Sequence, residues 1–339
     1  MQISKITVGA WPLLLAPMDE ITDPSFRHIC KMYGADMMYT EFVSSDGLVR
    51  EVAKTRQKLT IYDDERPIGI QLYGHLIDAM VESARLAASA APDVIDINFG
   101  CPMKKIANRG AGSGMMREPE KMVEMTRQIV RAVPVPVTVK TRLGWDEESK
   151  NIVELAERLQ DAGIAAITIH GRTRAQMYRG EADWSLIGAV KRNPRMRIPV
   201  IGNGDIKTPD DAQKAFDRYG IDGIMIGRAA IGHPWLFREI KHYLATGRRL
   251  PEMPVTERVA LAKLHLQKSI EHKGERVGIL EFRRHLSHYF KALDNFKETR
   301  LKLVTSNDVD EIHALLDYVH ARWGEPPSPI APDASLPAQ

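Results

Sequence analysis

The sequence of 339 residues is poor in cysteine, with Cys30 and Cys101 lying far apart. Two distant cysteines form no disulfide framework, which excludes the small disulfide-stabilised secreted folds and indicates a reducing compartment. No apolar run approaches the ~18 residues of a membrane span, and residues 8–18 are broken by two prolines and lack the features of a signal peptide. The sequence therefore predicts a cytoplasmic protein that does not contact a membrane.

The sequence also lacks a strong excess of charge of either sign, because 47 basic side chains against 44 acidic ones give a formal net charge of +3. This excludes nucleic-acid binding through a global positive charge, so any such binding must come from local basic segments. Hydrophobic residues make up 44% of the chain and charged residues 27%, which is typical of a globular protein. The length predicts one large domain and a smaller one.

Apolar segments rich in β-forming residues recur at steady intervals and alternate with helical patterns. Near-continuous apolar runs are typical of parallel strands that are covered on both faces. Eight such strands over about 230 residues predict a (β/α)8 TIM barrel of the α/β class. A doubly wound sheet is the alternative, but its Gly-x-Gly-x-x-Gly turn is missing. The expected strands are 13–17, 37–42, 68–73, 94–99, 135–141, 166–170, 199–202 and 223–227, and the expected helices are 78–91, 118–133, 151–162, 184–192 and 210–219.

The pattern changes after a proline-containing linker at residues 250–254. Apolar residues then recur at helical spacing from 256 to 323 without a strand signal, which predicts a small all-α domain. The final segment is rich in proline and poor in apolar residues, which indicates disorder. The sequence thus predicts a catalytic domain at 1–248, a helical domain at 249–323 and a disordered tail at 324–339.

Polar residues gather at the expected carboxyl ends of the strands, where a barrel of this kind carries its active site. The turns after the last two strands contain small residues, and one carries Arg228, which predicts a phosphate site formed by backbone N–H groups. Glycines that merely allow tight turns are the alternative. In chain order the strand ends carry Ala16, Pro17 and Met18, then Gln71, Asn98, Cys101, Lys140, Arg142, His170, Arg172, Asn203, Gly204, Asp205, Gly227 and Arg228.

Cys101 lies in a Gly/Pro turn after an apolar strand and is followed by Lys104 and Lys105. A thiol with an ordinary pKa of about 8.5 is protonated at neutral pH and can act as a general acid. The nearby lysines would lower its pKa, so a nucleophilic role stays open. A thiol that only packs is the third interpretation, and it is the one we prefer for Cys30.

Three further strand-end residues each allow a functional and a structural interpretation. Lys140 ends an otherwise apolar strand and can stabilise negative charge on a cofactor, or it can form a salt bridge. Gln71 can meet the edge of a heterocycle or simply close its strand. His170 can bond to a cofactor or cap its strand, and the absence of metal-ligand spacing around it predicts no metal site.

Together these motifs resemble those of the tRNA-dihydrouridine synthases, and of the bacterial B-type branch in particular. The resemblance covers about residues 8–246 and continues more weakly through the helical region. It implies an FMN-containing barrel followed by a helical tRNA-binding domain. It rests on residues 16–18, 21–23, 26–27, 71–72, 96–102 with Lys104, 137–140, 168–174, 202–206, 225–230 and 234–240.

At the matching positions, the resemblance implies a role for each residue. Cys101 would be the proton donor and Asn98 would lie near the substrate uracil, while Gln71, Lys140 and His170 would lie at the flavin ring. NADPH would reduce the FMN, hydride would pass from flavin N5 to uracil C6, and Cys101 would protonate C5 of a uridine in the tRNA D-loop region. The implied remaining flavin contacts are Ala16, Pro17, Met18, Asn203, Gly204, Asp205, Gly227 and Arg228.

Two segments, 103–117 and 276–302, are locally basic. Such charge runs are usually solvated faces, but with the resemblance we expect them to contact RNA phosphates. The expected RNA or substrate contacts are Lys104, Lys105, Arg109, Arg172, Arg283 and Arg284.

Two other functions remain as alternatives at this stage. One is an FMN barrel that reduces a free pyrimidine or an enoate, which would need no basic helical domain. The other is a non-catalytic tRNA-binding protein, which would need neither Cys101 nor Lys140. A monomer without an obligate protein partner is expected in either case.

Overall fold

The computed structural model describes residues 1–324 and divides the chain into two units, Met1–Leu250 and a second unit that begins at Pro251. The boundary predicted between residues 248 and 249 lies close to this division. The predicted tail falls outside the described residues, apart from Gly324.

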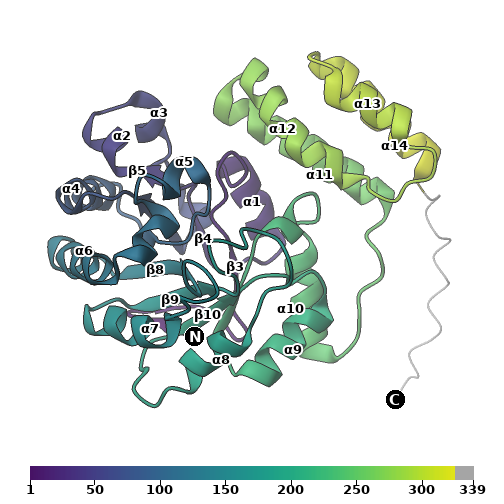
Figure 1. Cartoon of the computed structure of the whole chain (residues 1–339). Coiled ribbons are helices and arrows are strands. Elements are labelled where there is room, and N and C mark those ends of the chain that lie inside the picture. Colours follow the sequence, from purple (N-terminus) through teal and green to yellow (C-terminus); the bar gives the residue numbers. More distant parts are fainter. Residues whose placement is uncertain (325–339) are drawn as a thin grey trace, which may run out of the picture. The chain divides into compact units, whose positions relative to one another are not determined.

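Parallel strands of the first unit form a barrel with helices around it (Figure 1). The strands are β3 (Leu13–Leu15), β4 (Met38–Tyr39), β5 (Val43–Ser44), β6 (Ile68–Tyr73), β7 (Val94–Asn98), β8 (Val137–Arg142), β9 (Ala166–His170), β10 (Val200–Asn203) and β11 (Gly223–Ile226). They pair in the order β3-β11-β10-β9-β8-β7-β6-β4, and β5 extends the pairing along β6. Backbone bonds from Leu15 N to Met37 O (2.9 Å) and from Asp36 N to Leu13 O (2.8 Å) join the two ends. The predicted (β/α)8 fold is confirmed.

Ten α-helices lie in the described part of the first unit, and five of them fall where the sequence predicts helices, at 77–88, 119–132, 152–161, 185–192 and 209–219. The amphipathic helices at 24–32 and 236–246 are not among the predicted ones. A short antiparallel pair, β1 (Gln2–Ile3) and β2 (Ile6–Thr7), precedes the barrel and is not predicted, since two-residue strands carry no periodicity. The helices are α1 (Pro24–Met32), α2 (Ser45–Val49), α3 (Ala53–Gln57), α4 (Ile77–Ala88), α5 (Lys104–Ala107), α6 (Pro119–Ala132), α7 (Ile152–Asp161), α8 (Ser185–Arg192), α9 (Pro209–Tyr219) and α10 (Leu236–Thr246).

Local sequence sets the ends of these helices. At the start of α1, Asp23 Oδ1 accepts a hydrogen bond from Phe26 N at 2.9 Å, and Pro24 occupies the first turn, where no N–H is needed. Helix α9 begins in the same way at Thr208 and ends at Gly220, whose φ of 62° is the left-handed conformation that favours glycine.

Two apolar cores pack on opposite faces of the barrel sheet. Leu14, Met37 and Met225 belong to a cluster inside the barrel. Their neighbours Leu13 and Leu15 belong to a larger cluster that packs against the surrounding helices. This alternation follows from the period of two along a strand, and it leaves the strand ends as the place for polar groups.

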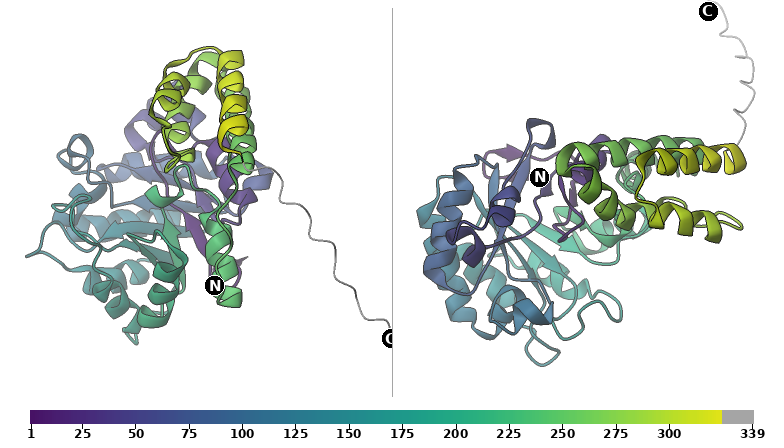
Figure 2. Two further views of the ribbon diagram at one scale, coloured as in Figure 1. Left: turned by 90° about the vertical axis from the view of Figure 1, so that its right-hand side faces the viewer. Right: turned by 90° about the horizontal axis from the view of Figure 1, so that it is seen from above.

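The second unit is helical throughout its described residues, 251–324. Its helices are α11 (Val255–Lys273), α12 (Glu275–Tyr289), α13 (Lys297–Thr305) and α14 (Val309–Trp323). Figure 2 shows α11 lying beside α12, and α14 also packs against α11. Their shared core buries Leu266, Phe282 and Leu316 completely or nearly so.

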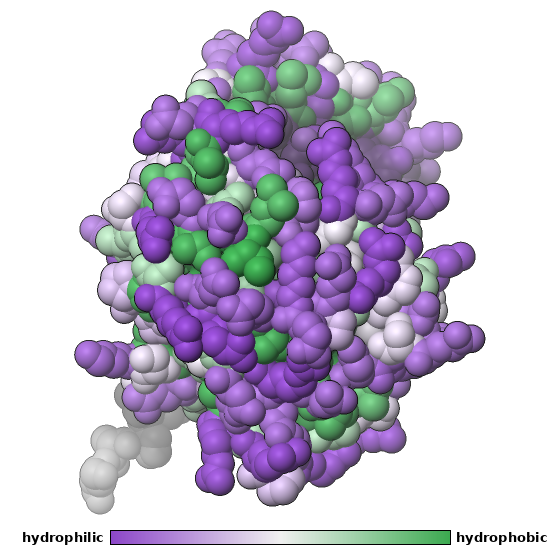
Figure 3. Space-filling model, turned by 60° about the vertical axis from the view of Figure 1, so that its left-hand side comes forward, coloured by the Kyte–Doolittle hydropathy of each residue, from purple (hydrophilic) through white to green (hydrophobic). Residues whose placement is uncertain are grey.

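The surface is mainly hydrophilic on the face shown in Figure 3, with small hydrophobic patches between the charged side chains. Among the helices of residues 1–324, none has the length and apolar character needed to cross a membrane.

Candidate active site

The turn that carries Cys101 follows β7 and is held from three sides. Asn98 Oδ1 accepts hydrogen bonds from the backbone N–H groups of Gly100 and Cys101, both at 2.9 Å. Ser113 Oγ donates to the Cys101 carbonyl at 2.7 Å, and Arg142 Nε donates to the Gly100 carbonyl at 2.7 Å. The position of the thiol is therefore fixed by the fold before any ligand binds.

The electrostatic surroundings of Cys101 favour a neutral thiol. The residue is 8% exposed, and burial raises the pKa of its thiol. The Met103 backbone N–H and the cations Arg142 and Lys140 act in the opposite direction, but they do not outweigh burial. A neutral thiol at a barrel mouth can donate a proton, whereas a nucleophilic cysteine would need a lowered pKa.

Lys140 lies in the C-terminal half of β8 and is paired in register with Asn98 of β7. Its Nζ donates to Asn203 Oδ1 at 3.2 Å. Burial and, to a smaller extent, Arg142 lower the pKa of Lys140 to about 8, while Asp96 and Cys101 act in the opposite direction. A buried cation of this kind gains stability from a negatively charged or electron-rich group placed beside it.

Asp205, after β10, is tied to the loop after β9 through Arg172. Arg172 Nη2 donates to Asp205 Oδ2 at 2.6 Å and to Gly180 O at 2.6 Å, and Nη1 donates to His170 Nε2 at 3.2 Å. Since Nε2 of His170 accepts, its Nδ1 carries the proton, and burial lowers the pKa of this imidazole well below the usual value, so the ring is neutral. Arg172 is 2% exposed, so it holds loops together and lies below the surface that RNA could touch.

The loop after β10 approaches the loop after β9, and the loop after β11 contacts the loop after β3. Gly204 has a φ of 127°, and a Cβ placed on it would lie 2.6 Å from the Cβ of Ala182. A Cβ on Gly227 would lie 3.5 Å from the Cβ of Ala16 and 3.6 Å from Met18 Sδ. Gly204 is buried and Gly227 half-buried, and the lack of side chains at these turns would let a phosphate approach the backbone N–H groups closely.

Arg228 is an accessible cation of this region. Its side chain is 55% exposed, and its Nη2 lies 3.8 Å from Asp205 Oδ1. The ring of Tyr178, itself exposed, lies 4.6 Å from the guanidinium carbon. Such a cation can turn toward an anionic ligand without leaving a buried partner unpaired.

Gln71 lies below this surface. It is fully buried, its Nε2 donates to Asp96 Oδ2 at 2.6 Å, and its Oε1 accepts from Asn98 Nδ2 at 2.8 Å. Its amide therefore supports Asn98 from within the barrel, and contact with a flavin ring would require exposure of the side chain.

The predicted site residues fall into three groups. The barrel mouth brings together the residues of the β3, β7, β8, β9, β10 and β11 ends, with Pro17 half-buried among them. Lys104, Lys105 and Arg109 are exposed in and just after α5. Arg283 and Arg284 belong to α12 in the second unit, where Arg284 is exposed and Arg283 half-buried.

Arg283 has a structural role, so its replacement should have a different effect from the replacement of its neighbour Arg284. Its Nη2 donates to Thr305 O (3.1 Å), Ser306 O (2.7 Å) and Asn307 Oδ1 (2.8 Å), which joins α12 to the end of α13. We expect Arg283→Glu to destabilise this end of α13 by about 2 kcal/mol, because three acceptors lose their donor. Hydrogen exchange of the α13 amides would detect the loss.

Arg284→Glu is the matched control for this variant. It should leave exchange in α13 unchanged and, if this face binds RNA, weaken tRNA binding several-fold at moderate salt. Equal exchange in the two variants would contradict the structural task of Arg283.

Four residues that shape the site have no role predicted from the sequence: Asp96, Thr138, Arg142 and Ser113. Asp96 could have been found, because a carboxylate within the apolar run 94–97 needs partners. Arg142 sits at a strand end, but its burial and its bond to Gly100 depend on the tertiary fold. Ser113 carries no signal in the sequence.

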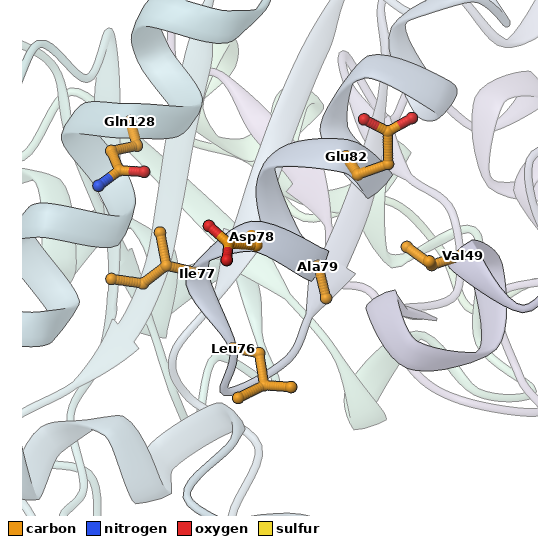
Figure 4. Close-up of a pocket in the computed structure, with 7 residues that line it drawn as sticks. All are labelled: Val49, Leu76, Ile77, Asp78, Ala79, Glu82 and Gln128. Atoms are coloured by element: carbon orange, nitrogen blue, oxygen red, sulfur yellow. The ribbon is translucent and has the colours of Figure 1, made fainter.

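A hollow on the first unit lies away from these residues. It is lined by Val49, Leu76, Ile77, Asp78, Ala79, Glu82 and Gln128, from α2, α4 and α6 and the turn before α4 (Figure 4). None of the predicted site residues lines it. Within residues 1–324, no three His, Cys, Asp or Glu side chains are grouped so as to hold a metal ion.

Comparison with known proteins gives relatives along nearly the whole chain. A family model described as dihydrouridine synthase matches residues 14–321. The tRNA-dihydrouridine synthase B of Pseudomonas aeruginosa is 40% identical over 312 residues, which cover 91% of this chain and 93% of that protein. A probable tRNA-dihydrouridine synthase 1 of Synechocystis is 41% identical over 318 residues, 94% of this chain and 88% of that protein.

Among solved structures, a morphinone reductase variant in complex with tetrahydroNAD aligns with a TM-score of 0.53. The alignment covers 74% of this chain and 91% of that chain at 12% sequence identity. At this identity the likeness supports the barrel fold alone.

Proposed function

The chain belongs to the dihydrouridine synthase family, and we propose that it reduces a uridine of tRNA to 5,6-dihydrouridine. The observation that carries the proposal is the buried, neutral thiol of Cys101, fixed beside Asn98 and Lys140 at the mouth of the barrel. The names of the relatives supply the substrate class, and the proposed position is a uridine of the D-loop region.

We propose FMN as the cofactor and NADPH as the reductant. The donor set at the barrel mouth fits a flavin, with the narrow backbone cradle at Gly204 and the exposed guanidinium of Arg228 suited to a phosphate. Lys140 and the amide of Asn203 suit a polar heterocycle. When bound, the flavin would supply the hydride that adds to C6 of the uracil ring.

The chain itself would supply the proton and the charge stabilisation. Cys101 Sγ–H donates its proton to C5, so that the C5–C6 double bond becomes a single bond with one new hydrogen on each carbon. The thiolate left on Cys101 is stabilised by Arg142 and Lys140, the cations that already lower its pKa, and water returns the proton. Lys140 also offsets negative charge on the bound heterocycles.

The buried environment of Cys101 predicts the pH dependence of uridine reduction. The protonated thiol is the active form, and burial raises its pKa, so loss of the thiol proton should slow the reaction only above the ordinary thiol pKa of about 8.5. Loss of the charge on Lys140, whose pKa lies at about 8, should give a separate decline near that pH. Single-turnover measurements with pre-reduced enzyme would record how the rate declines with pH. A decline centred well below pH 8 would contradict the assignment of Cys101 as the acid.

The RNA would be held outside the barrel mouth. Lys104, Lys105 and Arg109 are exposed close to Cys101 in sequence and form a basic segment suited to phosphates. A uridine must leave its stack to reach a buried thiol, so we expect the target nucleotide to be extruded from the tRNA.

The proposed function is tested with the purified chain and unmodified tRNA. The protein should show flavin absorbance as isolated and should form dihydrouridine in tRNA when NADPH is added. Free uracil and orotate serve as competing substrates. NADPH-dependent reduction of free pyrimidine with unmodified tRNA, or a protein that binds no flavin, would refute the proposal.

A further inference from the structure

A chain of hydrogen bonds between buried side chains runs beneath the candidate active site; we name it the buried relay. Thr138 Oγ1 donates to Asp96 Oδ1 at 2.5 Å, and Gln71 Nε2 donates to Asp96 Oδ2 at 2.6 Å. Asn98 Nδ2 donates to Gln71 Oε1 at 2.8 Å, and Asn98 Oδ1 accepts from Cys101 N at 2.9 Å. Asp96, Gln71, Asn98 and Thr138 are each 6% exposed or less, so water does not replace these bonds.

Chemistry at the two ends fixes the direction of the relay. The backbone N–H groups of Gly100 and Cys101 can only donate, so the atom of Asn98 that faces them must be its oxygen. The Asn98 nitrogen then faces Gln71 and requires the amide oxygen there. The nitrogen of Gln71 consequently faces Asp96, which must accept.

We propose that Asp96 is a positioning residue for the uridine reduction assigned above, a role that rests on the proposed function. Its carboxylate orients the Gln71 amide, this orients the Asn98 amide, and Asn98 Oδ1 thereby holds the turn that presents the Cys101 thiol. Asp96 itself touches neither thiol nor substrate; it acts through two amides, and it accepts at the end of the relay opposite to the N–H groups of Gly100 and Cys101.

The burial of Asp96 is consistent with this task. Burial raises the pKa of its carboxyl to about 6, while the bonds from Gln71 and Thr138 and the nearby Lys140 lower it. At neutral pH and above, the group is therefore a carboxylate that accepts at both oxygens. A buried carboxylate is costly, and a residue serving only to fill space would be apolar.

Asparagine at position 96 changes one oxygen to a nitrogen with almost no change in volume. That nitrogen can face Thr138, whose hydroxyl can accept as well as donate, or it can face Gln71. If it faces Gln71, two donors meet, and the Gln71 amide must turn over. Asn98 must then also turn, and its nitrogen would face the N–H groups of Gly100 and Cys101. The turn then loses Asn98 Oδ1 as its acceptor, and the position of the Cys101 thiol is no longer fixed.

The variants for the test are Asp96→Asn, the double variant Asp96→Asn with Gln71→Glu, and Thr138→Val. In the double variant, the carboxylate introduced at position 71 accepts from the amides at positions 96 and 98, which restores the acceptor that Asn98 requires. Thr138→Val deletes a bond to the same carboxylate without altering the order of the amides, so it is the control for a role in packing alone.

Flavin content and melting temperature are measured first for each variant. Two further quantities are then compared. One is the single-turnover rate of uridine reduction per bound flavin. The other is the rate at which iodoacetamide alkylates Cys101 in the whole chain, with the fully buried Cys30 as an internal reference. The second quantity needs no tRNA and no activity.

We expect Asp96→Asn to slow uridine reduction by about 10²-fold, as a small misplacement of a reacting group does, and to change Cys101 alkylation several-fold. The double variant should recover most of both losses, and Thr138→Val should change each at most a few-fold. The proposal is overturned if Asp96→Asn behaves like the parent, if the folded double variant recovers neither quantity, or if Thr138→Val is as slow as Asp96→Asn.

The alkylation data separate this proposal from the proposed function. If the parent chain reduces no uridine but the alkylation rates follow the predicted order, the assigned reaction is wrong and the positioning of Cys101 by Asp96 stands. If the parent reduces uridine but alkylation of Cys101 is the same in every variant, the assigned reaction stands and the positioning role of Asp96 is wrong.

Discussion

Replacing Cys101 with alanine should remove most uridine reduction while leaving flavin content and NADPH oxidation near those of the parent. A general acid placed within reach of the reacting carbon contributes a rate factor of about 10²–10⁴, and Cys101 is the group to which we assign this task. His170 is neutral, with its Nε2 bonded to Arg172, and Lys140 is held at Asn203. The single-turnover rate of dihydrouridine formation measures the loss.

Cys30→Ala is the matched control, since the chain has one other thiol. Cys30 is fully buried in α1, within the outer core, and burial raises its pKa well above the usual value. Its replacement should lower stability slightly through lost packing and leave the rate per bound flavin unchanged. Uridine reduction by Cys101→Ala at more than about a tenth of the parent rate would refute the role of Cys101 as proton donor.

The barrel could be predicted from the sequence because its strands are buried on both faces and read as continuous apolar runs. The runs at 68–73, 94–99 and 166–170 coincide with β6, β7 and β9 to within a residue. The short β4 and β5 could not be separated, since the chain near residues 40–42 bends between two pairings with β6. Such breaks are set by closure of the barrel, not by local residue preference.

The positions of Cys101 and Lys140 at the barrel mouth could be predicted, because each is an unusual residue near the end of an apolar strand. The site was not predictable where a charged side chain is buried by tertiary partners. Arg283 occurs in a basic segment that favours a solvated surface, and Arg172 was expected to contact substrate or RNA, yet their guanidinium groups donate to backbone carbonyls of neighbouring loops. The partners lie in other segments, so local charge patterns carry no trace of them.

Two arginines face Asp205, and replacing each by methionine should change the free energy of unfolding by very different amounts. Arg172 is 2% exposed and Arg228 is 55% exposed. Arg172→Met removes the donor to Asp205, Gly180 O and Arg179 O at once, and should lower the free energy of unfolding by about 3 kcal/mol. Urea unfolding of the flavin-free chain, followed by tryptophan fluorescence, would measure this difference.

Arg228→Met should cost less than about 1 kcal/mol of stability, because an exposed ion pair at 3.8 Å is screened by water. If Arg228 instead meets the flavin phosphate, its replacement should weaken FMN binding about tenfold or more, as expected when a charge-assisted contact is lost. Arg172→Met weakens FMN binding as well, but through the loops that shape the cradle, and it does so together with lost stability. Equal stability costs for the two arginines would contradict the structural role of Arg172. Unaltered FMN affinity in Arg228→Met would show that the phosphate is held elsewhere, since burial and reach are the properties that separate these two side chains.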